Sequence, residues 1–137
     1  MLKVWGKKKF NFIINDISGI SEDVAKISPW FKNVSCKSGK DGTKLTIKVI
    51  KDSKIFLKKK GILCFPVISF ANEKKIINFT KKKFKNLKII GLNEWPLPKE
   101  MINKISILEK LKKKGYINYK NNFGMIIWYT KIFIAYN

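Results

Sequence analysis

Arginine and histidine are both absent from this chain of 137 residues. Its 30 basic residues are therefore all lysine, and nine carboxylates leave a formal net charge of +21. Lysine contacts phosphate as a flexible point charge, whereas arginine can read a base edge through two parallel hydrogen bonds. The composition thus predicts a protein that binds nucleic-acid backbones rather than one that reads a base sequence.

The lack of histidine and the shortage of acidic groups also limit the chemistry that the chain can perform. Histidine is the usual side chain for proton transfer near neutral pH and the commonest metal ligand. The carboxylates are scattered among lysines and turns, and only Glu94 and Glu100, which flank two prolines, could approach each other across a bend. We therefore expect no enzymatic activity, no catalytic residues, no metal and no cofactor.

Cysteines and long apolar runs are scarce as well. Cys36 and Cys64 lie far apart in the sequence, so free buried thiols are expected rather than a disulfide framework. No run approaches the ~20 apolar residues of a membrane helix. Residues 1–10 lack both the apolar centre of a signal peptide and the arginines of a transit peptide. These absences predict no membrane insertion and, for a protein that works in an organelle, synthesis inside that organelle.

What the chain does have is a hydrophobic fraction of 45%, which is enough for a core, beside its very high charge. Self-repulsion at +21 destabilises a compact monomer unless counter-charge is supplied. Nucleic acid is the best source of that counter-charge, ahead of a membrane surface or an acidic protein. We expect the isolated protein to fold poorly, or to aggregate, at low salt without RNA.

The lysines are spread over the whole chain instead of forming one basic tail. A single lysine run is ordinarily a solvated surface, but four separate triplets indicate a protein embedded in nucleic acid. The residues predicted to bind RNA phosphates are Lys7, Lys8, Lys9, Lys58, Lys59, Lys60, Lys81, Lys82, Lys83, Lys85, Lys112, Lys113 and Lys114.

Residues 1–57 are predicted to form an N-terminal α+β extension. Residues 8–15 alternate weakly between apolar and polar side chains, which favours a strand. Ser21 is a suitable N-cap for a short helix within residues 16–27, because two acidic residues follow it.

The sequence Ser-Gly-Lys-Asp-Gly at 38–42 predicts a turn. We expect strands on both sides of it, at residues 33–37 and 43–50, and the second of these alternates between apolar residues and lysines. The turn lacks the spacing of a phosphate-binding Walker loop.

The rest of the chain predicts a strand, a helix and a long hairpin. Residues 62–70 favour a strand, and residues 73–87, capped by Asn72, favour an amphipathic helix with lysines on its outer face. Residues 88–137 contain two apolar runs around a basic tip, which predicts one long β-hairpin. The expected fold class is α+β: a small antiparallel sheet with a packed amphipathic helix and a long protruding β-hairpin arm.

Six pieces of this half follow one another in the order of a known family. They are a strand ending at Phe70, a helix from Asn72, Lys-Ile-Ile-Gly at 88–91, Pro-Leu-Pro-Lys at 96–99, Lys-Ile-Ser-Ile-Leu at 104–108 and the apolar run at 122–134. In this order they resemble the S-ten family, the tenth protein of the small ribosomal subunit, over roughly residues 62–137. The Pro-Leu-Pro-Lys segment is the sharpest part of the resemblance.

The sequence also departs from the family pattern. The segment before Pro96 lacks the family's first proline and gains Trp95, and the tip lacks the family's histidine. Ile127, Trp128 and Tyr129 stand where the family has basic residues. Residues 58–137 would therefore be an S-ten-like domain without the family's last helix and strand.

The resemblance implies a structural constituent of the small subunit of a ribosome, in the head of that subunit. The chain would bind small-subunit rRNA through its lysines and neighbouring head proteins through the hairpin arm, with no small-molecule substrate. The residues of the protein-contact arm would be Trp95, Pro96, Leu97, Pro98, Lys99 and Tyr116. The abundance of lysine, isoleucine, asparagine and phenylalanine is typical of an AT-rich genome, so we expect a mitochondrial ribosome in the matrix and an organelle-encoded chain. A plastid genome or an AT-rich nuclear genome would give the same bias.

Two other functions are consistent with the sequence. A free-standing basic protein that coats organellar DNA or RNA would bind generic nucleic acid with a steep salt dependence and need no protein partner. An accessory subunit of a membrane complex, docked through residues 123–136, would stay with the membrane after nuclease treatment.

Overall fold

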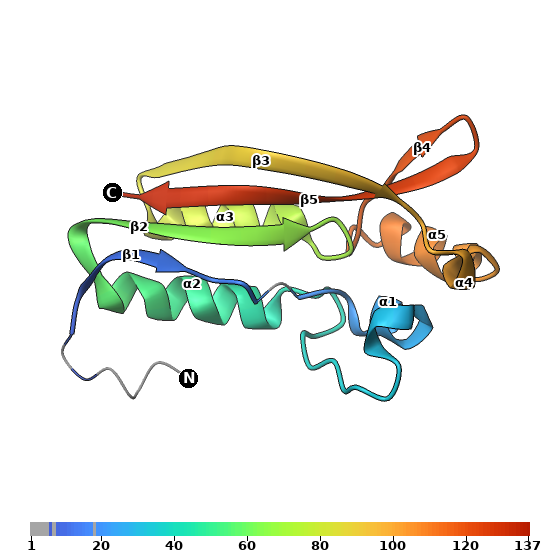
Figure 1. Cartoon of the computed structure of the whole chain (residues 1–137), viewed down its shortest axis with the longest axis horizontal. Coiled ribbons are helices and arrows are strands. Elements are labelled where there is room, and N and C mark those ends of the chain that lie inside the picture. Colours follow the sequence, from blue (N-terminus) through green and yellow to red (C-terminus); the bar gives the residue numbers. More distant parts are fainter. Residues whose placement is uncertain (1–5, 7, 18) are drawn as a thin grey trace.

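The computed structural model describes residues 6, 8–17 and 19–137 and shows one mixed sheet with helices packed on it (Figure 1). The strand order is β1, β2, β5, β3, and a short β4 pairs with the far part of β5. The strands are β1 (Phe10–Ile14), β2 (Leu57–Ile68), β3 (Asn86–Pro96), β4 (Lys120–Asn122) and β5 (Met125–Tyr136). The predicted α+β class is confirmed, but the sheet is not wholly antiparallel because β1 and β2 run parallel.

The two connections between parallel strands each contain helices, which is usual because a parallel connection has to cross back over the sheet. Between β1 and β2 lie α1 (Glu22–Ile27), a short 3-10 helix η2 (Pro29–Phe31) and α2 (Lys44–Phe56), and α3 (Glu73–Lys83) joins β2 to β3. β5 then returns antiparallel between β2 and β3. The unit formed by β2, α3, β3 and β5 is a split βαβ arrangement.

Both α2 and α3 pack on the same face of the sheet and enclose the first hydrophobic core. Ile50 of α2 and Ile76 of α3 meet Leu63, Phe65 and Phe133, which β2 and β5 supply. The two phenylalanine rings stack with centroids 5.6 Å apart. This layer fixes which face of each strand is buried.

Helix α2 corrects the strand that the sequence predicted at residues 43–50. That segment alternates with period two, but its lysines and its buried residues also follow the spacing of a helix. The buried positions of α2 are Thr46, Ile50 and Ser53. Packing of this buried stripe on the sheet stabilises the helix. The β-branched residues prefer a strand, but that preference is weak and depends on context, so the packing outweighs it.

Other elements agree with the prediction more closely. The strand at 8–15 is β1, the strand at 62–70 is the longer β2, and the helix at 73–87 is α3. The Asn72 side chain accepts a hydrogen bond from the amide of Lys75 at 3.0 Å, which confirms the expected N-cap. Residues 33–37 do not form the expected strand.

The segment around α1 is also only partly as expected. Helix α1 lies at the end of the predicted range 16–27, and Ser21 precedes it. The Ser21 hydroxyl donates to the Lys40 carbonyl at 2.6 Å instead of capping the helix.

The predicted hairpin is correct in its two long strands and wrong at its tip. β3 and β5 pair antiparallel from Asn86 opposite Tyr136 to Pro96 opposite Ile127. Between them the chain forms α4 (Lys99–Ile102) and α5 (Ile105–Lys113) in place of the expected strand at 104–108 and the extended tip.

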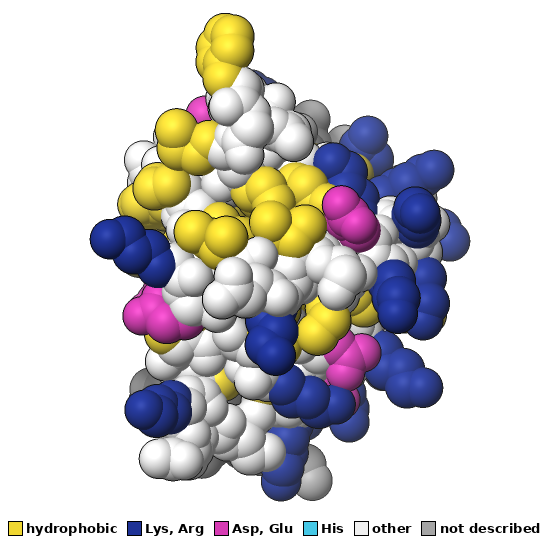
Figure 2. All heavy atoms as spheres, turned by 90° about the vertical axis from the view of Figure 1, so that its right-hand side faces the viewer, with side chains coloured by type: hydrophobic (Ala, Val, Ile, Leu, Met, Phe, Trp, Pro, Cys, Tyr) yellow, Lys and Arg dark blue, Asp and Glu magenta, His cyan; other side chains and the backbone are white. Residues whose placement is uncertain are grey.

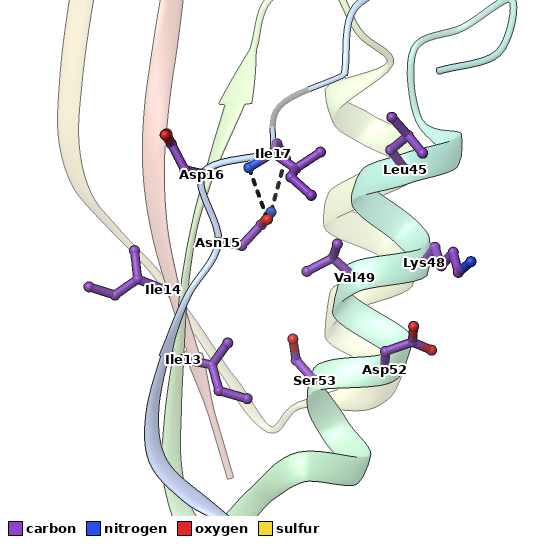
Figure 3. Close-up of a pocket in the computed structure, with 10 residues that line it drawn as sticks. All are labelled: Ile13, Ile14, Asn15, Asp16, Ile17, Leu45, Lys48, Val49, Asp52 and Ser53. Carbon is purple, nitrogen blue, oxygen red and sulfur yellow. Dashed lines mark hydrogen bonds between the residues drawn. The ribbon is translucent and has the colours of Figure 1, made fainter. Parts of the chain in front are cut away.

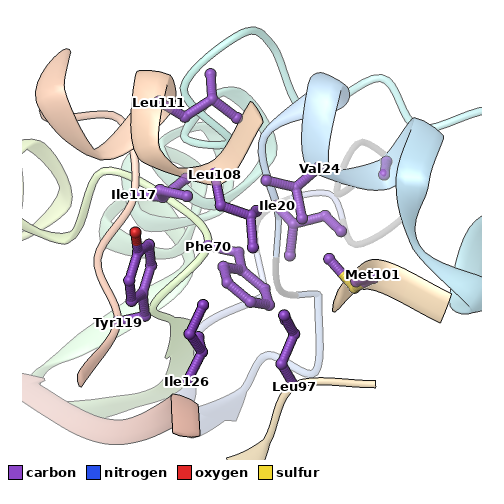
Figure 4. Close-up of a cluster of buried hydrophobic side chains, with 11 residues drawn as sticks. Ile20, Val24, Phe70, Leu97, Met101, Leu108, Leu111, Ile117, Tyr119 and Ile126 are labelled. Atoms are coloured by element: carbon purple, nitrogen blue, oxygen red, sulfur yellow. The ribbon is translucent and has the colours of Figure 1, made fainter. Parts of the chain in front are cut away.

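The tip folds back because its apolar residues have helical spacing. Leu108 and Leu111 are three residues apart on α5 and both are buried. With Met101 of α4 they join Ile20 and Val24 in a second core around Phe70 (Figure 4). The helices α4 and α5 between β3 and β5 are therefore packed against the protein, whereas β4 and the start of β5 project as a shorter hairpin (Figure 1).

The predicted boundary at residues 57 and 58 falls at the first residues of β2. The segments on its two sides share the sheet, through β1 and β2, and share the second core, where Ile20 and Val24 touch α5 residues. The division therefore marks two stretches of sequence that pack as one body.

The turn predicted at residues 38–42 is present, and hydrogen bonds join it to α1 and to the start of α3. Gly39 donates its amide to Glu22 at 2.8 Å, and the carbonyl of Asp41 accepts from the amide of Asn72 at 2.8 Å. The carboxylate of Asp41 accepts from Lys75 at 2.7 Å and from the Thr43 hydroxyl at 2.8 Å. These are internal carboxylate contacts, so the loop holds the chain's own acidic groups rather than a phosphate.

The environment of Asp41 explains its ionisation. Burial acts to raise the pKa of this carboxyl, but the hydrogen bonds from Lys75 and Thr43 outweigh it and lower the pKa below its ordinary value. Asp41 is thus kept charged while it joins the turn to α3.

Substituting Gly42 tests how tightly this turn is packed. Gly42 has φ +72°, and a Cβ placed there would lie 2.6 Å from the Ile20 carbonyl carbon and the Ser21 amide nitrogen. Gly115 has almost the same φ, +71°, but a Cβ added to it would meet nothing within 4 Å.

We expect Gly115→Ala to cost about 1–2 kcal/mol of unfolding free energy, the ordinary penalty for a side chain in the left-handed region. Gly42→Ala should cost roughly 2 kcal/mol more, because backbone atoms must also move. Urea unfolding of both variants at high salt measures the difference. Equal losses would show that the turn is not the close-packed junction described.

Candidate nucleic-acid interface

The direction of the strands gathers three of the four lysine runs at one end of the molecule. β1 and β2 are parallel, and β2 and β3 are parallel because each runs antiparallel to β5. All three therefore begin at the same end, on the left of Figure 1. A lysine run lies just before or at the start of each of these strands, so the topology brings together runs that are far apart in the sequence.

Individual contacts confirm that these segments adjoin one another. Phe10 of β1 lies opposite Leu57 of β2, and the Lys9 ammonium donates to the carbonyl of Ile55. The Lys54 ammonium lies 4.7 Å from the centroid of the Phe84 ring. Residues 8–10, 54–60 and 81–88 thus form one continuous surface.

This surface, called the lysine end below, has eleven lysines and no carboxylate in its three segments. Its lysines are Lys8, Lys9, Lys54, Lys58, Lys59, Lys60, Lys81, Lys82, Lys83, Lys85 and Lys88. All of them except the half-buried Lys54 are exposed. Burial lowers the pKa of Lys54, and the positive charge of Lys85 lowers it further, which is the expected effect of crowding like charges.

The lysine end is suited to binding a polyanion. Each ammonium that replaces a condensed counterion on a nucleic acid contributes to binding through counterion release. Lysine stems are flexible and supply three donors each, so they can follow an irregular phosphate backbone without reading its bases.

The structure brings together nine of the thirteen lysines predicted to bind RNA. Lys7 lies outside the described residues. Lys112, Lys113 and Lys114 are exposed at the opposite end of the molecule, where they form a separate basic group at the end of α5. The Lys112 ammonium donates to the Tyr119 carbonyl at 2.7 Å and lies 4.1 Å from the Tyr119 ring centroid.

Sequence reasoning missed Lys54 and Lys88 as members of the interface. Neither belongs to a lysine triplet. Lys54 could be found only by placing it on the last turn of α2, and Lys88 only by placing it near the start of β3.

Several carboxylates are engaged within the chain. Ion pairs join Asp23 to Lys26, Asp41 to Lys75, Glu73 to Lys131 and Glu94 to Lys120. Across residues 6, 8–17 and 19–137 there is no cluster of three or more acidic or cysteine side chains that could hold a metal. In the same part of the chain, no helix has the length and apolar character needed to span a bilayer.

The residues predicted for the protein-contact arm divide into exposed and packed groups. Pro96 and Lys99 are exposed, and Pro98 and Tyr116 are half-buried. Leu97 belongs to the second core, which corrects its assignment as a contact residue, because the helical tip covers it. Trp95 is stacked on Trp128 at 4.6 Å between centroids, and Trp128 also contacts Trp30 at 4.9 Å.

Among the residues that the structure describes, no helix covers most of the sheet face opposite α2 and α3. Strand register puts Ile14 beside Cys64 and Ile134, and Pro66 beside Ile132, on this side. Figure 3 shows Ile14 pointing away from α2, while Ile13 points towards the crevice between β1 and α2. The residues of this open sheet face are Phe12, Ile14, Ile62, Cys64, Pro66, Ile132, Ile134 and Tyr136.

The crevice in Figure 3 is a hollow of about 340 Å³ between β1 and α2. Its walls are mostly apolar, with Ile13, Leu45 and Val49 among them. The buried hydroxyl of Ser53 lines it and has no hydrogen-bond partner. The charged residues Asp16, Lys48 and Asp52 also line the crevice, so its apolar interior has a polar margin.

Comparison of the sequence with protein-family models and with curated proteins gives no match. The resemblance to the S-ten family therefore rests on the order of the sequence pieces alone.

Charge removal at the two ends of the molecule tests whether the lysine end is the main RNA-binding surface. The variant K58Q/K59Q/K60Q should lower affinity for single-stranded RNA. It should also reduce the slope of log affinity against log salt by about 2, because three fewer phosphate contacts release fewer counterions. The variant K112Q/K113Q/K114Q removes the same charge at the opposite end and should change the slope much less.

Fluorescence anisotropy with a labelled RNA over a salt series measures both slopes, after circular dichroism has confirmed folding. Equal changes in the two variants would mean that binding depends on net charge and not on the lysine end.

Proposed function

We propose that this protein is a non-enzymatic structural constituent of the small subunit of a mitochondrial ribosome. It binds rRNA phosphates through the lysine end and neighbouring head proteins through its apolar surfaces. The observation that carries the proposal is the gathering of eleven lysines, on three segments that contain no carboxylate, at the end where three parallel strands begin.

The order of structural elements supports the ribosomal assignment. The resemblance implies a strand, a helix and two paired strands joined by a long connection. β2, α3, β3 and β5 have this order, and the Pro-Leu-Pro-Lys segment stands at the end of β3. The helices α4 and α5 replace the short strand and the extended tip that the resemblance implies.

The N-terminal half supplies a helix and a strand to the same body. α2 packs beside α3, and β1 extends the sheet beyond β2. In this proposal they take the place of the last helix and strand of the family.

The open sheet face supports a role inside an assembly rather than a free-standing one. Its central residues on β2 and β5 are mainly aliphatic, so they cannot stack on bases as the aromatic residues of RNA-binding sheets do. Lys88, which belongs to the lysine end, borders this face opposite Ile134, and the eight residues that define the face are uncharged. An exposed apolar patch of this kind is typical of a protein interface.

The two alternative functions make different use of these surfaces. A free-standing nucleic-acid-binding protein would need the lysine end but would leave the open sheet face in water. A membrane accessory subunit would use the apolar surfaces and would have no need of the lysine end. The ribosomal proposal uses both surfaces. The amino-acid bias typical of an AT-rich genome favours the mitochondrial matrix as the location.

A gradient experiment tests the proposal with a matched pair of variants. The wild-type chain should co-migrate with the small ribosomal subunit of detergent-solubilised mitochondria at high salt. Ile14→Glu, at a position that is 70% exposed, should fold normally but fail to incorporate, because a buried unpaired carboxylate opposes docking. Val34→Glu, at a loop position that is 61% exposed, should incorporate normally.

Mass spectrometry of the gradient fractions locates each chain. A wild-type chain found at the top of the gradient, or with DNA or a membrane complex, would overturn the ribosomal proposal. Normal incorporation of both variants would be consistent with rRNA binding but would contradict the docking role of the open sheet face.

A further inference from the structure

The hairpin of β4 and β5 ends in a two-residue turn with an unusual residue in it. Asn122 lies opposite Met125, and Phe123 and Gly124 form the turn, with φ values of +52° and +82°. Positive φ at both central residues is the geometry of a type I′ turn. The amide of Gly124 donates to the Asn121 side chain at 3.0 Å, which holds the turn together.

Phenylalanine is a poor choice for the first position of such a turn. Asparagine, aspartate and glycine are preferred there, because a bulky side chain at positive φ strains the backbone. Packing does not compensate for this strain, since the Phe123 side chain is fully exposed, at 110% of the reference value. The turn therefore gives up stability in the free protein to present an aromatic ring to the solvent.

The surroundings of Phe123 are apolar as well. Met125 and Ile102 are 54% and 49% exposed, and a hollow of about 350 Å³ lies among these side chains, with Leu97 and Ile126 in its lining. Figure 2 faces this end of the molecule and shows hydrophobic side chains gathered in its upper part, with lysines mainly along one side. Phe123, Met125 and Ile102 are called the apolar tip below.

The hairpin and its flanks are nearly uncharged in a chain that is otherwise rich in lysine. Residues 115–130 contain one lysine and no carboxylate. That lysine, Lys120, is paired with Glu94. The apolar tip therefore has no free ammonium on its own hairpin with which to hold a phosphate, in contrast to the lysine end.

We propose that Phe123 is an anchor residue that inserts into an apolar, uncharged pocket of a partner protein. Interfaces depend on a few large side chains that fill such pockets, and the surrounding contacts mainly exclude water. A second copy of this chain is disfavoured as the partner, because each copy has a charge of +21. The identity of the partner as another protein of the small ribosomal subunit rests on the proposed function; the anchor role of Phe123 does not.

The variant Phe123→Asn separates this proposal from a merely structural role. Asparagine suits the turn, so the isolated variant should unfold at a temperature higher by roughly 3 °C. Its incorporation into the native particle should nevertheless fall by about tenfold or more, because the anchor is lost. Val34→Asn, at an exposed apolar position away from the tip, should leave incorporation unchanged.

The expected result is thus a variant that is more stable alone and weaker in assembly. Unchanged incorporation of Phe123→Asn in a competition with the wild-type chain would overturn the proposal. Loss of incorporation together with loss of stability would also overturn it, since the turn would then be a structural element only. The affinity of the variant for RNA should equal that of the wild type. A loss of incorporation caused by the missing anchor can therefore be distinguished from a loss of RNA binding at the lysine end.

A photo-reactive benzoyl-phenylalanine at position 123 identifies what the tip contacts in the native particle. A cross-link to a protein that co-migrates with the chain through the salt gradient, and that is lost on competition with the wild-type chain, supports the proposal. A cross-link to RNA or to a second copy of the chain overturns it. Binding of the wild-type protein, but not of Phe123→Asn, to vesicles of phosphatidylcholine and cardiolipin would overturn it in favour of a lipid contact.

Discussion

The pairing of β5 on both of its sides is the interaction on which the rest of this structure depends. β5 lies antiparallel between β2 and β3, so those two strands must run parallel and begin at the same end. β1 joins them in the same direction. The three lysine runs that accompany the beginnings of these strands are brought together only for this reason. The same strand extends past the sheet to pair with β4, which places Phe123 at the opposite end.

The protein thus separates its two kinds of contact in space. The lysine end concentrates positive charges that repel one another, and a bound polyanion would relieve that repulsion. The open sheet face and the apolar tip present side chains that are better covered by protein than by water. A chain with this division is suited to lie between RNA and other proteins. Its carboxylates, such as Asp41 and Glu73, form ion pairs that join its own elements.

The sequence predicted local features well wherever a single pattern was present. Residues 8–15 alternate weakly, residues 62–70 form a short apolar run and residues 73–87 have the spacing of an amphipathic helix. Each pattern favoured one structure, and the two strands of the long hairpin were also paired correctly. The strand predicted at residues 43–50 was wrong because their pattern fits a strand and a helix alike, and packing on the sheet favoured the helix. The strand predicted at residues 104–108 was wrong as well. That prediction placed Ile105 and Leu108 in a strand and Leu111 in the hairpin tip, which concealed the helical spacing of the three residues.

The candidate interface shows the same limit. The four lysine triplets are visible in the sequence, but their arrangement follows from long-range strand pairing. For that reason, Lys112–Lys114 could not be separated from the other triplets, nor Lys54 and Lys88 added to them, before the strand order was known. Leu97 was assigned to a contact surface because the helical tip that covers it was not foreseen.

The most direct test of this account is quantitative lysine acetylation of the protein in its native particle, before and after nuclease digestion, read by mass spectrometry. The account predicts that lysines of the lysine end, such as Lys59 and Lys82, are protected before digestion and become reactive after it. Lys26, which is exposed on α1 away from that end, should react in both states. Equal reactivity of Lys26, Lys59 and Lys82 before digestion would contradict the claim that the lysine end binds nucleic acid.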